Sequence, residues 1–319
     1  MGRLKAALDP YIVALMLMMV AASLVPARGG FAQAMAGIAN AGIVLLFFLH
    51  GAKLSREALL AGAGHWRLHI SVLAATFALF PLLGLGIAAL PGIPQVVAGG
   101  MLFLTLLPST VQSSIAFTSI ARGNVAAAVC SASFSNFVGI FLTPLLVALL
   151  MGGSGAGFSW GAVEKIVLQL LVPFVLGHLS RPVVGGLVAR HRLVVSYVDR
   201  GSILLVVYTA FSAAVVEGLW HRLPPAVIIQ IAALCTGLLA VVLVLTWLAG
   251  RALGFTREDA IVLLFCGSKK SLASGVPMAG VLFPAPQVGV VILPLMLFHQ
   301  LQLVACAVIA RRAAASQAR

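Results

Sequence analysis

The sequence predicts an all-α membrane protein with ten transmembrane helices, arranged as two inverted five-helix repeats. Three observations lead to this fold class. Of the 319 residues, 62% are hydrophobic and only 8% are charged, which is too little polar surface for a water-soluble globule. Apolar stretches of about 20 residues, the length of a membrane-spanning helix, recur along nearly the whole chain. Two of these stretches are broken by polar residues at corresponding positions of the two halves.

The apolar stretches define the expected spans and their orientation. The spans are expected at about 10–27, 33–50, 68–90, 95–121, 123–150, 161–180, 199–217, 225–249, 258–283 and 286–310. Because each half holds an odd number of spans, the second half enters the membrane from the opposite side. Repeats of this kind are common in secondary transporters.

The first span has one alternative interpretation. Arg3 and Lys5 precede an apolar run, and the small residues around Gln33 resemble a signal-peptide cleavage site. However, the run from Tyr11 to Ala27 is long for a signal core, and its removal would leave one repeat incomplete. We therefore expect a transmembrane helix here.

The net charge of +13 indicates membrane topology. Basic residues lie between the apolar stretches, without the interleaved aromatic residues that bind single strands, so nucleic acid is not an expected partner. The side of the two termini holds Arg3, Lys5, Lys53, Arg56, Arg67, Arg122, Arg181, Arg190, Arg192, Arg200, Arg251, Arg257, Arg311, Arg312 and Arg319. The other side holds only Arg28, Lys165 and Arg222. The positive-inside rule therefore predicts a cytoplasmic (inner) membrane protein with both termini in the cytoplasm.

Two interrupted spans mark the candidate site. The fourth span is broken at Leu107 to Thr110, and the ninth is broken at Cys266 to Ser271. A broken helix in lipid leaves backbone groups that protein or a wet cavity must satisfy, and in transporters such breaks bind ligands. The candidate substrate- or ion-binding residues at the breaks are Ser109, Thr110, Gln112, Ser113, Ser114, Gly267, Ser268, Lys269, Lys270 and Ser271.

The lysine pair is the strongest single signal. A lysine in mid-membrane costs roughly 2.5–3.5 kcal/mol, whereas a helix C-terminus returns at most about 2 kcal/mol. The difference predicts a wet cavity, a bound anion, or a lysine that has lost its proton; the alternative is a lysine that only braces helix ends. Because the carboxylates lie near the expected span ends, the site suits an anionic substrate.

Polar residues of neighbouring spans complete the expected cavity. Asn136 is expected to contribute from the fifth span, with Ser131, Ser133 and Ser135 as weaker candidates. From the tenth span we expect His299 and Gln300 to contribute, with Gln302 nearby. A buried amide needs partners at both ends, whereas His299 is either a proton carrier or a structural histidine.

Enzymatic and metal-binding functions are not expected. The four cysteines, Cys130, Cys235, Cys266 and Cys306, all fall within apolar stretches and lack metal-ligand spacing. The sequence contains no acid pair or Ser/His arrangement placed for hydrolysis. No resident cofactor is predicted.

The chain resembles the bile acid/sodium symporter family. The resemblance rests on SIARGNVA at residues 119–126, on LTPL at 142–145, and on CGSKKSLASGVP at 266–277, which is similar to the divergent branch related to the seventh human bile-acid carrier. It implies one transmembrane domain over residues 1–319. In that domain, a panel of helices 1, 2, 6 and 7 (1–50 and 161–217) accompanies a core of helices 3–5 and 8–10 (68–150 and 225–310). Helices 4 and 9 would cross in the core, which would move against the panel.

The sequence departs from this family at the sodium ligands. Ser114 matches a ligand position of the sodium-binding members. The other aligned positions hold Ile115, Ala128, Ala132, Phe265 and Lys269, where the family places oxygen-bearing side chains. These replacements argue against sodium coupling, and leave sodium, a proton or neither open as the coupling ion.

The sequence therefore predicts a secondary active transporter of a small organic anion, either bile-acid-like or another organic acid, that works by alternating access in the lipid membrane. The alternative is a non-transporting regulatory or scaffold membrane protein with the same fold, in which the lysines lock the crossing shut.

Overall fold

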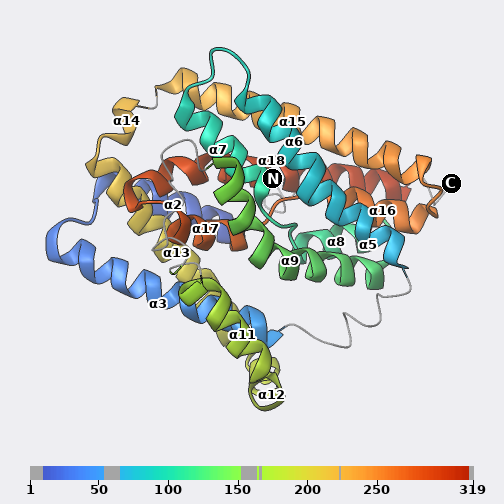
Figure 1. The fold of residues 1–319 in the computed structure, drawn as a ribbon, viewed down its shortest axis with the longest axis horizontal. Helices are drawn as coiled ribbons and strands as arrows, with labels where there is room; N and C mark the ends of the chain where they lie inside the picture. Colours follow the sequence, from blue (N-terminus) through green and yellow to red (C-terminus); the bar gives the residue numbers. More distant parts are fainter. Residues whose placement is uncertain (1–9, 54–64, 152–163, 165–166, 223, 316–319) are drawn as a thin grey trace. The chain divides into compact units, whose positions relative to one another are not determined.

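The described part of the chain folds into helices (Figure 1). The computed structural model describes residues 10–53, 65–151, 164, 167–222 and 224–315, and within these ranges it contains no β-strand. The residues near the two termini, 1–9 and 316–319, lie outside the described part of the chain. The all-helical fold class predicted from the sequence is confirmed.

The helices divide into two compact units. Unit 1 comprises Met1–Leu54, Gly152–Pro224 and Val276–Ile292, and unit 2 comprises Ser55–Met151, Pro225–Gly275 and Leu293–Arg319. Unit 1 contains α2 (Pro10–Leu24), α3 (Gly29–Lys53), the π-helix η3 (Val167–Leu171), α11 (Val172–Leu179), α12 (Arg181–Arg190), α13 (Arg192–Val216) and α14 (Leu219–Arg222). Unit 2 contains α5 (Trp66–Ala74), the π-helix η2 (Ala75–Leu79), α6 (Phe80–Ala88), α7 (Gln95–Leu106), α8 (Gln112–Ile120), α9 (Val125–Met151), α15 (Pro225–Ala252) and α16 (Arg257–Gly267). The boundary between units falls within α17 (Leu272–Leu282) and α18 (Ala285–Ala315).

The helices follow the apolar pattern of the sequence. Each of the ten expected spans contains helix, and the fourth and ninth each contain two separate helices. By length and composition, six of the described helices can cross a membrane, or seven if the bent pair formed by Val167–Leu179 and Arg181–Arg190 counts as one span. The chain is thus a multi-pass membrane protein. Its sequence did not indicate the short helices α12 and α14.

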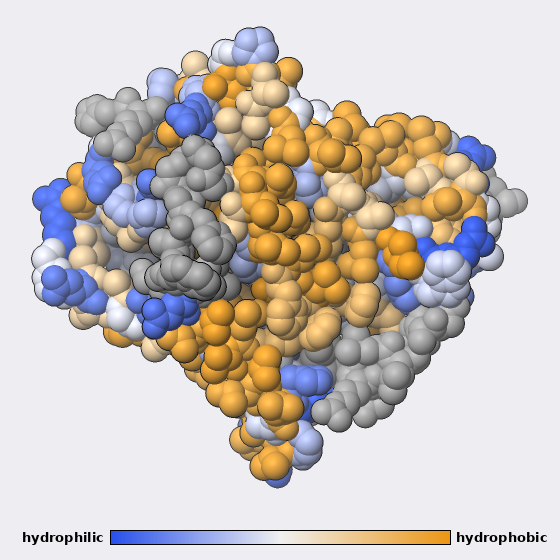
Figure 2. Space-filling model, in the orientation of Figure 1, coloured by the Kyte–Doolittle hydropathy of each residue, from blue (hydrophilic) through white to orange (hydrophobic). Residues whose placement is uncertain are grey.

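Apolar side chains remain exposed on the helices, as lipid contact requires. Hydrophobic residues dominate the face seen in Figure 2, and the exposed large side chains include Leu82, Leu149, Val183 and Ile229. In water such extensive apolar exposure would drive association. In a bilayer these side chains face hydrocarbon, while the helices satisfy their own backbone groups.

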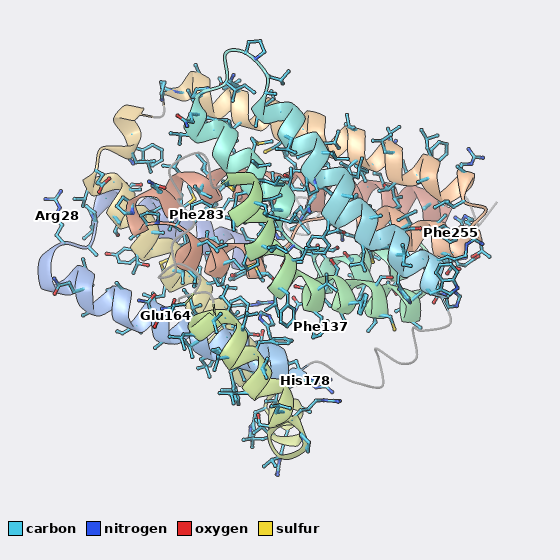
Figure 3. The ribbon with its side chains drawn as sticks, viewed as in Figure 1. Arg28, Phe137, Glu164, His178, Phe255 and Phe283 are labelled. Carbon is cyan, nitrogen blue, oxygen red and sulfur yellow. The ribbon has the colours of Figure 1, made fainter. Side chains whose placement is uncertain are left out.

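Basic residues gather at one end of unit 2. Arg67 donates to the carbonyl of Leu253, and its guanidinium lies 5.9 Å from the ring centroid of Phe255 in the turn between α15 and α16 (Figure 3). Arg257 donates to the carbonyl of Ala313, near the described end of α18. These contacts bring the start of α5 and the end of α15 together, and likewise the start of α16 and the end of α18.

In unit 1, α3 packs against α11 at very short range. A Cβ atom built on Gly177 would lie 1.9 Å from the carbonyl oxygen of Phe48, and one built on Gly51 would lie 2.0 Å from that of Phe174. Only a residue without a Cβ atom permits this approach of the two backbones, and small residues serve the same purpose in other membrane helix pairs.

We predict that Gly177→Ala destabilises the protein by roughly 1–3 kcal/mol, because the added methyl group forces α3 and α11 apart. The measurement is the thermal unfolding of the purified protein in detergent. Gly186→Ala on α12 is the matched control, since a Cβ atom there meets nothing within 4 Å. Equal melting temperatures for the two variants would contradict the close-packing argument.

Candidate functional site: a lysine-bearing junction of two broken helices

Two helix breaks meet inside unit 2. The first separates α7 from α8, where Pro108 has no N–H to continue a helix and Leu107 is extended, with φ −78° and ψ 155°. The second separates α16 from α17. The N–H of Ser271 donates to the carbonyl of Pro108 at 2.9 Å, and the hydroxyl of Ser109 donates to the carbonyl of Cys266 at 2.5 Å. The predicted interruptions are therefore present and in direct contact.

Helix α9 satisfies the backbone groups released by the first break. The hydroxyl of Thr143 donates to the carbonyl of Leu106 at 2.8 Å. The side-chain amide of Asn136 donates to the carbonyl of Ser109 at 2.6 Å, and the N–H of Ser109 donates to the hydroxyl of Ser135 at 3.1 Å. Since an unpaired backbone group in lipid costs several kcal/mol, these polar residues of α9 make the break tolerable.

Serine hydroxyls bond to backbone groups on both sides of the second break. The hydroxyl of Ser268 donates back to the carbonyl of Leu264 in the last turn of α16. Ser271 precedes the first residue of α17, and its hydroxyl accepts the N–H of Ser274 at 3.2 Å, as an N-cap residue does. The hydroxyl of Ser274 donates to the side-chain oxygen of Asn136 at 2.9 Å. Asn136 therefore contacts both breaks.

Lys270 is fully buried and makes hydrogen bonds with its whole ammonium group. Its Nζ donates to the carbonyls of Thr76 at 2.8 Å, Thr105 at 2.7 Å and Leu107 at 2.6 Å. The same atom lies 4.2 Å from the ring centroid of Phe80. Three hydrogen bonds from a charged group, at roughly 1.5–3 kcal/mol each, outweigh the roughly 2.5–3.5 kcal/mol cost of a lysine in mid-membrane.

Lys269 is equally buried but has fewer partners. Its Nζ donates to the hydroxyl of Ser113 at 3.2 Å and lies 4.4 Å and 5.8 Å from the ring centroids of Phe117 and Phe265. On the same turn of α8, the hydroxyl of Ser114 donates to the carbonyl of Phe265 at 3.1 Å. Among the described residues, neither Lys269 nor Lys270 forms a salt bridge. The ammonium of Lys269 therefore lies beside the first turn of α8 without a negative partner there.

The side chain of Gln302 bonds to both backbone groups of Lys270. Its side-chain oxygen accepts the N–H of Lys270, and its NH₂ group donates to the carbonyl of the same residue, both at 2.9 Å. The Nδ1 atom of His299 lies 2.8 Å from the Gln302 amide nitrogen. Gln302, rather than Gln300, supplies the buried amide of α18 that bonds to the break.

The structure thus brings together most of the predicted site residues. The residues that bond to one of the two breaks or form part of it are Ser109, Ser113, Ser114, Asn136, Gly267, Ser268, Lys269, Lys270 and Ser271. Thr110 lies in the first break, and its hydroxyl is buried without a hydrogen-bond partner among the described residues. Gln112 is exposed at the start of α8, and Gln300 is half-buried. His299 reaches the site through Gln302.

The positions aligned with sodium ligands lie mostly among apolar side chains. Ala128 and Ala132 are fully buried in a cluster with Val262 and Cys266, and Ile115 packs against it. Phe265 is buried in a second apolar cluster. Oxygen is the donor atom that alkali and alkaline-earth cations prefer, and these side chains provide none.

Several contributors to the site were not identified from the sequence. They are the carbonyls of Thr76, Thr105 and Leu107 and the rings of Phe80 and Phe117. One sequence signal could have indicated the Thr76 carbonyl. In a π-helix, the carbonyl of Thr76 would accept the N–H of the residue five positions later. That residue is Pro81, inside the third span, and it has no N–H.

The apolar helices and the junction of two broken helices are those of a polytopic membrane protein, and broken helices of this kind are typical of secondary transporters. Residues 9–315 match the SBF-like CPA transporter family. The chain belongs to this family.

Three relatives cover nearly the whole chain, and two of them carry transporter names. It is 55% identical over 315 residues to "Uncharacterized protein PA2026" of Pseudomonas aeruginosa, covering 98% of this chain and 95% of that one. It is 54% identical over 307 residues to "Putative symporter YfeH" of Escherichia coli, covering 96% and 92%. It is 26% identical over 304 residues to "Sodium/bile acid cotransporter 7" of Danio rerio, covering 92% and 90%.

We predict that Gln302→Leu destabilises the protein by about 2 kcal/mol or more, because the N–H and carbonyl of Lys270 lose their partner while they stay buried. The measurement is the melting temperature in detergent. Gln300→Leu is the control, since Gln300 lies two residues away on the same helix and is half-buried. A loss of stability that is as large in the control would show that the Gln302 amide has no special role.

Proposed function

We propose that the protein is a secondary active transporter of a small organic anion, and that Lys269 is the positive group that binds this anion. The observation that carries the proposal is the buried Lys269 ammonium beside the N-terminus of α8, with one hydrogen bond and no salt bridge among the described residues. A positive side chain and a helix N-terminus both attract negative charge. Because the Lys269 ammonium and the N-terminus of α8 lie side by side in a low-dielectric site, the site favours binding of an anion.

The neighbouring polar groups support this assignment. Thr110 places a buried hydroxyl without a described partner in the same break. Ser113 is half-buried, and Gln112 before it is exposed, so a short polar path runs from Lys269 along the start of α8. By contrast, Lys270 already donates three hydrogen bonds to backbone carbonyls, so it has no donor left for a substrate. Of the two lysines, we assign anion binding to Lys269.

We further propose the ten-helix architecture with two inverted repeats, divided into panel helices (1–50 and 161–217) and core helices (68–150 and 225–310). Two observations support it. The breaks fall at corresponding places of the two halves, and Ser109 and Cys266, which bond to each other across them, are 157 residues apart. The two compact units follow a similar division, since unit 1 includes Met1–Leu54 and Gly152–Pro224 and unit 2 includes Ser55–Met151 and Pro225–Gly275. They differ from it at Val276–Ile292, which falls in unit 1 although the proposed core includes it.

The burial of the proposed site supports a mechanism of alternating access. The side chain of Lys269 has an exposed fraction of 0%, so an anion reaches it only after the surroundings of the junction rearrange. Arg67, Arg251 and Arg257 lie at the helix ends that gather at one end of unit 2. With the positive-inside rule, we place that end and both termini in the cytoplasm, in an inner membrane.

The proposed substrate class is supported by a single positive charge that lies among aromatic rings. Phe117 and Phe265 flank the Lys269 ammonium, so a carboxylate or sulfonate with an apolar body suits this environment. The name of the Danio rerio relative, "Sodium/bile acid cotransporter 7", points to the same kind of molecule. We propose a bile-acid-like anion or another organic acid.

Coupling to sodium at the junction is not part of the proposal. Ala128, Ala132 and Ile115 contribute methyl and methylene groups where sodium would need oxygen, and the ammonium of Lys269 would repel a second cation. A proton is the more suitable coupling ion for secondary active transport here; with no coupled ion, the anion would only move down its own electrochemical gradient.

The test of anion binding is uptake of radiolabelled taurocholate and benzoate into proteoliposomes. We expect Lys269→Gln to reduce uptake at least about tenfold, since a lost charge-assisted hydrogen bond is worth roughly 1.5–3 kcal/mol. Lys53→Gln is the matched control, because Lys53 pairs with Asp199 in unit 1 and is partly exposed. Unchanged uptake in Lys269→Gln would remove this lysine from the mechanism. Absence of uptake by the unmodified protein for every anion tested would favour the scaffold alternative.

The same proteoliposomes test the coupling ion. With the membrane potential clamped, we expect equal taurocholate uptake when external sodium is replaced by potassium or choline, because the aligned ligand positions are apolar. The measurement is the initial uptake rate in the three salts. A several-fold higher rate in a sodium gradient alone would show that sodium is coupled, at a site other than the one the alignment indicates.

A further inference from the structure

The three carbonyls around Lys270 form a complete set of acceptors for one ammonium group. All three oxygens lie 2.6–2.8 Å from Nζ. A protonated amine has three N–H donors. A neutral amine has two, and its lone pair would then face the third oxygen. The arrangement therefore fits a charged primary ammonium and no neutral group.

Each of these carbonyls is free for a local reason. The N–H of Phe80 bonds to the carbonyl of Ala75 in η2, five residues back, and in this register the next donor, for Thr76, would be residue 81. That residue is Pro81, which has no N–H. Thr105 lies in the last turn of α7 and Leu107 is the C-cap residue that follows it, so neither carbonyl has a helical donor. The local backbone structure therefore leaves all three carbonyls without a backbone donor, independently of the Lys270 side chain.

An aromatic ring completes the surroundings. The ring of Phe80 lies 4.2 Å from Nζ, and it packs edge-on against Phe298 with centroids 6.0 Å apart. The face of an aromatic ring attracts any cation. The three carbonyl oxygens, in contrast, favour a cation that has N–H groups to donate. Sodium would lack its usual further oxygen ligands here.

We propose that these three carbonyls and Phe80 form a primary-ammonium binding site whose permanent occupant is the side chain of Lys270. By joining η2, the end of α7 and the second break, Lys270 acts as a positioning residue that fixes the junction. It does not contact the transported solute. This inference concerns folding stability, and it does not depend on the proposed transport function.

The test is chemical rescue of Lys270→Ala. This substitution removes the Cγ, Cδ, Cε and Nζ atoms, which n-propylammonium replaces atom for atom. We expect Lys270→Ala to melt at least about 5 °C below the unmodified protein in detergent. We expect n-propylammonium to recover a large part of that loss, whereas tetramethylammonium, which has charge but no N–H, and neutral propionamide recover none. Equal recovery by tetramethylammonium would overturn the hydrogen-bonded site, and so would a melting temperature unchanged by the substitution.

Lys269→Ala is the matched control for the chemical rescue of Lys270→Ala, because it truncates the neighbouring lysine in the same way. Lys269 is a neighbouring buried lysine with one hydrogen bond, so we expect no difference between n-propylammonium and tetramethylammonium in this variant. Selective recovery by n-propylammonium in both variants would show a general effect of amines and would also overturn the proposal.

Pro81→Ala provides a second test that leaves Lys270 in place. The new N–H competes for the Thr76 carbonyl, so we expect a melting temperature lower by several degrees. Pro173→Ala is its control, because Pro173 also follows a π-helix by two residues, in unit 1. If Lys270→Ala cannot be purified, this pair decides. An equal or higher melting temperature for Pro81→Ala than for Pro173→Ala would contradict the ammonium site.

Discussion

The structure of unit 2 depends on one constraint, namely that backbone groups freed inside a membrane must find partners within the protein. Pro108 ends α7 in the middle of an apolar stretch, and the second break ends α16 in the same way. Two neighbouring helices supply the partners: α9 contributes Thr143, Ser135 and Asn136, and α18 contributes Gln302. Each break also bonds to the other. The polar residues of an otherwise apolar chain are concentrated where this requirement is strongest.

The same constraint separates the roles of two adjacent lysines. Consecutive residues in a non-helical segment point in different directions, so Lys270 reaches the carbonyls at the end of α7, whereas Lys269 reaches the first turn of α8. A helix C-terminus is negative and an N-terminus is positive. One lysine is therefore neutralised by its surroundings, while the other adds to an existing positive potential. The first arrangement stabilises the junction, and the second is suited to an anion.

The helical fold, the two interruptions and the lysine pair could be predicted from the sequence, because hydropathy, proline and buried charge are strong local signals. Ser271 and Asn136 lie at the breaks in the structure, while their role in binding stays a prediction. The partners of Lys270 could not be predicted, since they are backbone carbonyls brought close by tertiary packing. Similarly, sequence spacing could not decide between Gln300 and Gln302, because the facing side of α18 depends on helix rotation. The family resemblance held over residues 9–315, while the ten-span topology remains a prediction.

A positive charge that is covalently part of the chain cannot accompany a solute across the bilayer. If Lys269 neutralises the bound anion, the loaded form moves without charge, but the unloaded form returns with its ammonium exposed to the electric field. Without a coupled proton, each cycle then transfers one net negative charge. With the cell interior negative by 100 mV, accumulation of a monovalent anion would be opposed by about 2.3 kcal/mol. The electrical gradient of a respiring cell would therefore favour export over uptake.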